Sequence, residues 1–182
     1  MIKICNLILD AIFPKKCIHC SREGSFICQD CLSLIELNKI QYCNCFHFPQ
    51  KGILCENCNH KISSVITIFN SRQALARKLY LKAQKIPELN LYISYLIITH
   101  LHNIVKLKID SNTDIVSEKK LDGLKRTLIK FVKIKQGEKS LIYLLKQYPE
   151  NFDESIIQKY KKVYIISLFR DLGAEEEKRR RK

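Results

Sequence analysis

Eight of the nine cysteines lie between Cys17 and Cys58. The first four, Cys17, Cys20, Cys28 and Cys31, form two Cys-x-x-Cys pairs separated by seven residues. A Cys-x-x-Cys turn holds two sulfurs at a separation that suits zinc, and two such turns complete a tetrahedral site. This spacing predicts a structural zinc site, in which Gly24 allows the chain to reverse between the two turns.

A second group of cysteines, less regular than the first, comprises Cys43, Cys45, Cys55 and Cys58. Its first pair is Cys-x-Cys, so the fourth ligand is either Cys45 or His47, and we favour Cys45. The spacing leaves open whether each group binds its own ion or whether the pairs are cross-braced. The prediction is therefore one or two structural zinc ions in closed sites, which fold the module and do not activate water.

The segment around these cysteines has few apolar runs, so it needs metal to hold it together. The apolar pattern predicts an amphipathic helix over 3–13, in which Cys5 is a buried apolar residue, and a strand over 65–69. It predicts a helix over 71–85 capped by Ser71, and over 89–105 either one core helix or a strand followed by a helix. Towards the C-terminus it predicts a helix over 140–148 and a strand over 161–169. The last of these is continuously apolar, which is typical of a strand inside a parallel sheet.

The chain is basic, with 32 Lys and Arg against 18 Asp and Glu among its 182 residues. Two zinc ions on eight thiolates would reduce the formal charge from +14 to about +10. Such an excess favours polyanions such as nucleic acid or phosphorylated ligands. Lys78, Lys82 and Lys85 share one helix face, for which simple solvation is favoured over ligand binding.

The compartment is inferred from the N-terminus and from the cysteine spacing. Asp10 interrupts the first apolar run, so a signal peptide is not expected, and paired cysteines at metal-ligand spacing are typical of the reducing cytoplasm. The charge-free stretch over 89–105 carries several polar residues, so no membrane span is expected.

The order of these motifs resembles the ComF family of competence proteins, which includes GntX-like members. The resemblance covers "LILDAIFPKKCIHCSREGSFICQDCLSLI", "CENC" and "SVITIFNSRQALARKLYLKAQKIPEL". It implies an α/β protein with an N-terminal double zinc ribbon, followed by an incomplete parallel sheet of the type I phosphoribosyltransferase kind with flanking helices. The implied boundaries are 1–62 for the helix and ribbon, 63–174 for the degenerate transferase-like domain and 175–182 for a charged tail.

The family's loop for phosphoribosyl pyrophosphate aligns with "VYIISLFRDLGA". Ser167 and Leu168 replace the acidic pair, and Asp171 would repel a phosphate that the loop should bind. Gly173 and Ala174 are all that survives of the loop, so phosphoribosyl pyrophosphate and magnesium are not expected to bind. The chain stops eight residues after Ala174, where the family continues, so the sheet is expected to be incomplete.

Three functions follow from these patterns. The first is a ComF-like protein without a working transferase loop, which binds single-stranded DNA, another nucleic acid or a protein partner in DNA uptake or processing. The second is an active phosphoribosyltransferase that uses phosphoribosyl pyrophosphate and magnesium. The third is a zinc-ribbon adaptor, or a fragment of a longer gene product.

Overall fold

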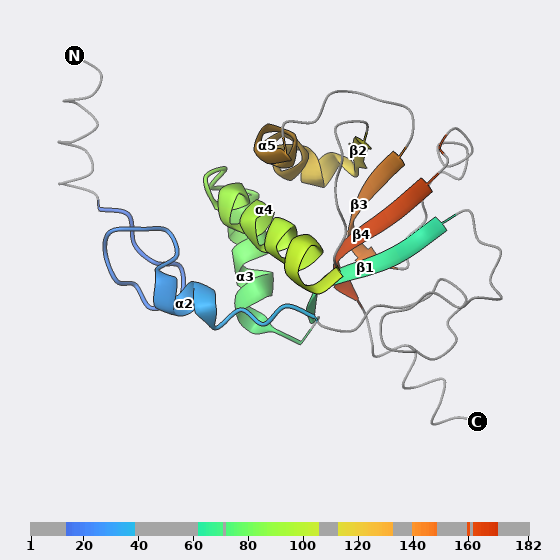
Figure 1. Ribbon diagram of the computed structural model, residues 1–182. Helices are drawn as coiled ribbons and strands as arrows, with labels where there is room; N and C mark the ends of the chain where they lie inside the picture. Colours follow the sequence, from blue (N-terminus) through green and yellow to red (C-terminus); the bar gives the residue numbers. More distant parts are fainter. Residues whose placement is uncertain are drawn as a thin grey trace, which may run out of the picture.

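The structure is a computed structural model, which describes residues 14–38, 62–70, 72–105, 113–132, 140–148, 160 and 162–170. Its elements (Figure 1) are, in chain order, α2 (Gln29–Ser33), β1 (Ile62–Asn70), α3 (Ala74–Ala83), α4 (Leu89–Thr99), the π-helix η1 (His100–Val105), β2 (Thr113–Ser117), the 3-10 helix η2 (Lys119–Leu121), α5 (Asp122–Val132), β3 (Ser140–Tyr148) and β4 (Lys162–Arg170). This is an α/β architecture, as the sequence predicts.

The four strands form one parallel sheet in the order β1-β4-β3-β2. β4 lies inside the sheet, where Ile165 pairs with Val65 on one side and with Tyr143 on the other. Its side chains are buried on both faces of the sheet, with Val163 and Ile165 on one face and Ile166 and Leu168 on the other. Burial on both faces explains the unbroken apolar run, and the predicted strands over 65–69 and 161–169 are confirmed.

The predicted helix over 140–148 is wrong, because this segment is the strand β3. Leu141 and Leu145 face one side of the sheet, whereas Ile142 and Leu144 face the other. A strand that is buried on both faces loses the alternation of polar and apolar residues, so its apolar run imitates the spacing of a helix.

The helices α3, α4 and α5 lie together on one face of the sheet (Figure 1). Leu79, Ile97 and Leu128 contribute to the core that they share with it. The predicted helix over 71–85 is confirmed as α3, although Ser71 lies outside the described residues. α4 and η1 form the core helix expected over 89–105. Among the described residues, no helix has the length and hydropathy to cross a bilayer.

The cysteine segment is joined to this core. Ile27 and Ile35 belong to the same apolar cluster as the helices. The backbone N–H of Asn38 donates to Ile68 O over 2.8 Å, and Gln73 Nε2 donates to Leu34 O over 3.2 Å. The segment therefore packs against the end of β1 and the start of α3. The expected helix over 3–13 lies outside the described residues, and the proposed boundary at residue 62 stays a prediction.

Candidate metal centre

A short reversal of the chain carries the first cysteine pair. The backbone N–H of Cys17 donates to Arg22 O over 2.8 Å, and that of Gly24 donates to Lys15 O over 2.8 Å. Next to them, the N–H of Ile18 donates to Phe26 O over 2.9 Å. These bonds reverse the chain between the two cysteine pairs, so that Cys28 lies beside Cys17 and Cys20.

The second pair is held by a helix. Cys28 is the N-terminal cap of α2, and its carbonyl accepts the N–H of Leu32 over 2.9 Å. Cys31 lies inside this helix, so the helical turn sets the separation of the two sulfurs. The backbone N–H of Cys28 also donates to Cys17 Sγ over 3.5 Å, which ties the two pairs together.

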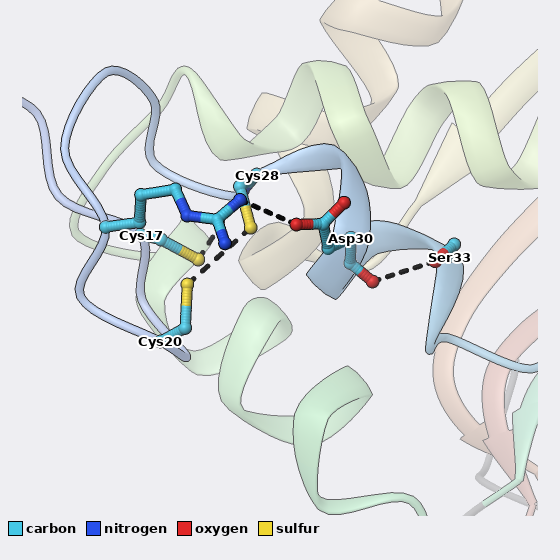
Figure 2. A network of polar contacts seen from close by, with 6 residues as sticks. Cys17, Cys20, Cys28, Asp30 and Ser33 are labelled. Carbon is cyan, nitrogen blue, oxygen red and sulfur yellow. Dashed lines mark hydrogen bonds and ion pairs between the residues drawn. The ribbon is translucent and has the colours of Figure 1, made fainter.

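The four sulfurs of Cys17, Cys20, Cys28 and Cys31 all lie within 4.8 Å of one another. Cys20 Sγ and Cys28 Sγ are 3.6 Å apart (Figure 2). A tetrahedral zinc ion with bonds of about 2.3 Å separates its sulfur ligands by about 3.8 Å, so the cluster fits zinc with little movement. The structure thus brings together the four ligands predicted for the first site.

The thiols of the cluster are electrostatically unequal. Burial would raise the pKa of Cys17, but hydrogen bonds from the backbone amides of Cys20, Cys28 and His19 lower it to about 6. Burial, followed by contacts with Cys28, Cys20 and Cys17, raises the pKa of Cys31 to about 12. Cys17 is therefore a readier ligand than Cys31 at neutral pH, because Cys31 must release a proton to bind metal.

Arg22 places a positive charge beside the cluster. Its guanidinium Nη1 lies 2.6 Å from Asp30 Oδ2, and the hydrogen bond to this carboxylate, with the charges of Asp30, Cys28 and Cys20, raises the pKa of Arg22. A zinc ion with four thiolates carries a net charge of about −2. The arginine therefore offsets part of the charge of a metal centre.

The donor set decides what such a site can do. Four thiolates at this separation suit zinc, and they fill all four positions of a tetrahedral ion, so no position is left for water or substrate. The centre that these residues support is structural.

The turn between the cysteine pairs depends on Gly24, whose φ is +111°. We expect Gly24→Ala to destabilise the metal-bound protein by about 1–2 kcal/mol, because a side chain is strained at this φ. Ser21 also has a positive φ, of 63°, so Ser21→Gly is the matched control and should have little effect. Urea denaturation of the two variants measures the difference, and equal stability would contradict this role of Gly24.

Several predicted site residues lie outside the described residues: Cys43, Cys45, Cys55, Cys58, Gly173 and Ala174. The two described residues of the aligned loop are in the sheet. Ser167 and Leu168 are both buried, and Ser167 Oγ donates to Phe169 O. Neither side chain is exposed to bind a ribose hydroxyl or a metal-bound water.

One buried polar group was not anticipated from the sequence. His100 begins the π-helix η1 and is fully buried, and neither of its ring nitrogens has a hydrogen-bond partner within the part of the chain that the structure describes. Burial lowers the pKa of His100 to about 4. The only sequence signal was a histidine at a position that the apolar pattern assigns to the core.

Comparison of the chain with protein-family models, with curated proteins and with solved structures found no match.

Proposed function

We propose that this chain is a ComF-like, metal-stabilised protein that binds single-stranded nucleic acid in DNA uptake or processing. In this proposal the described cysteine cluster is one half of a double zinc ribbon. Cys43, Cys45, Cys55 and Cys58 form the second half. The parallel sheet is related to that of phosphoribosyltransferases but has no catalytic loop.

The observation that carries the proposal is the exposed basic surface of the helical layer. On α3 and the turn after it, Lys78, Lys82 and Lys85 are exposed, and none of them has an ion-pair partner among the described residues. Arg126 and Lys130 are exposed on α5. Unpaired cations at the surface release counterions when they contact phosphates, which is the main source of affinity for nucleic acid.

Exposed aromatic side chains on α4 and α5 favour a single strand over a duplex. Tyr95 on α4 is 55% exposed, and Phe131 on α5 is 49% exposed. Unpaired bases stack on such rings, with about 1–3 kcal/mol per stacked base, whereas the bases of a duplex are already stacked. Cations and aromatic rings together are the features that single-strand binding requires.

The buried positions of Ser167 and Leu168 support a binding role over catalysis. The family's loop would present two carboxylates at these positions, whereas here both side chains are enclosed in the sheet. In this proposal the chain is related to transferases, but it lacks their acidic pair at these two positions.

The test of this proposal is the salt dependence of binding to labelled oligothymidylate, measured by fluorescence anisotropy. We expect the combined variant Lys78→Gln, Lys82→Gln and Lys85→Gln to bind at least tenfold more weakly, and its log–log salt slope to be smaller by about 2, because each phosphate contact contributes about 0.7. The matched control replaces the same three residues with arginine, keeps their charge and should bind like the original protein. No binding by the original protein near physiological salt would refute the proposal.

A further inference from the structure

The cysteine cluster has a feature that a purely structural metal site does not need. Cys17 and Cys31 are buried, Cys28 is half-buried and Cys20 is exposed. The exposed thiol belongs to the first pair, and its 3.6 Å sulfur contact, Cys28, belongs to the second (Figure 2). The exposed Cys20 thiol and the Cys28 sulfur beside it therefore come from different halves of the site.

We propose that Cys20 and Cys28 form a peroxide-sensitive pair, and that their oxidation to a disulfide releases the metal. This inference rests on the proposed metal centre and adds a form of regulation to it. A shift of about 1.5 Å brings the two sulfurs to bonding distance, which is a small movement for an exposed side chain such as that of Cys20.

The reaction balances with hydrogen peroxide as the oxidant. The Cys20 thiolate attacks one peroxide oxygen, the O–O bond breaks, and the products are a sulfenic acid and hydroxide. The Cys28 thiolate then attacks the Cys20 sulfur, the S–S bond forms, and the S–O bond breaks to release a second hydroxide. Two protons convert the hydroxides to water, and the pair has lost two electrons.

Oxidation of this pair should affect both halves of the site together. A Cys20–Cys28 disulfide takes one ligand from each pair and leaves the buried thiols of Cys17 and Cys31. Two thiolates hold zinc far more weakly than four, so the ion should leave.

Trypsin offers a direct test on the full-length protein. Cleavage after Lys16, Arg22 and Lys39 places Cys17 and Cys20 in one peptide and Cys28 and Cys31 in another. Bonds within a pair leave these peptides separate, whereas a Cys20–Cys28 bond joins them. We expect limiting hydrogen peroxide to produce the joined peptide, with fragmentation locating the bond, and to release about one metal ion per bond formed. Thiol reductant should reverse both changes.

A denatured, metal-free sample oxidised in parallel shows the mixture of bonds that forms without the folded site. Disulfides within the pairs, overoxidation of Cys20 without cross-linking, or retention of metal by the cross-linked form would each overturn the inference while leaving the metal centre intact. A reduced protein that carries no metal at all would instead refute the metal centre, so the two failures are distinguishable.

Discussion

Replacing Cys31 with serine should unfold the segment from Pro14 to Asn38. Structural zinc contributes about 10–16 kcal/mol to the folding of zinc-finger peptides, and losing one of four thiolates removes much of that contribution. We expect hydrogen–deuterium exchange at Cys17, Ile18 and Gly24, whose amides are hydrogen-bonded in the folded state, to accelerate to the rate of an unfolded peptide.

The matched control is Cys5→Ser, because Cys5 has no partner at ligand spacing in the sequence. This variant should retain both metal and amide protection. Ile27 and Ile35 share the core of the helical layer, so Cys31→Ser should also lower the free energy of unfolding of the whole protein by several kcal/mol. Normal protection of residues 14–38 in Cys31→Ser would show that packing, and not metal, holds the segment.

Replacing His100 with leucine should make the protein more resistant to acid. The folded-state pKa of His100 is about 4, against 6.5 in the unfolded chain, because burial disfavours the charged ring. The unfolded chain therefore binds the extra proton first as the pH falls below 6.5. Relative to neutral pH, His100 should therefore lower the free energy of unfolding by about 2 kcal/mol at pH 5 and by close to 3 kcal/mol near pH 4.

The measurement is urea denaturation of the two proteins from neutral pH to about pH 5, with the difference in unfolding free energy followed at each pH. Acid also weakens metal binding, but this effect is common to both proteins and cancels in the difference. His102→Gln is the control, because His102 is exposed and its Nδ1 contacts only Asn103 Oδ1, over 2.9 Å, among the described residues. A difference between the original protein and His100→Leu that does not change with pH would contradict a neutral, buried His100.

The first cysteine cluster could be predicted because metal-ligand spacing is a local property of the sequence. Two Cys-x-x-Cys pairs constrain their own geometry, and Gly24 at a positive φ completes the turn between them. β1 and β4 were predictable for a similar reason, because their β-branched apolar runs lie between turn signals. The local pattern alone is sufficient in these cases.

β3 and His100 were not predictable, because tertiary packing determines both. "SLIYLLKQY" is a strand only because β4 and β2 lie beside it, and the same letters satisfy helical spacing. At the end of α4 the carbonyls of Ile97 and Leu96 share the N–H of His100, and the π-helix η1 begins there. The composition of the segment carries no signature of this change from α-helix to π-helix. Partners that are distant in sequence supply the information that the local pattern lacks.

The family resemblance contributed expectations of a different kind. At Ser167 and Leu168, where the family's acidic pair would lie, both side chains are buried in β4.

The most direct test of the central claim is X-ray absorption spectroscopy, together with elemental analysis, of the reduced, purified protein. We expect at least one tightly bound zinc ion per chain with four sulfur ligands at about 2.3 Å. Reduced protein that is folded but carries no stoichiometric metal, or whose metal has mainly oxygen ligands, would contradict the assignment of Cys17, Cys20, Cys28 and Cys31 as a metal centre.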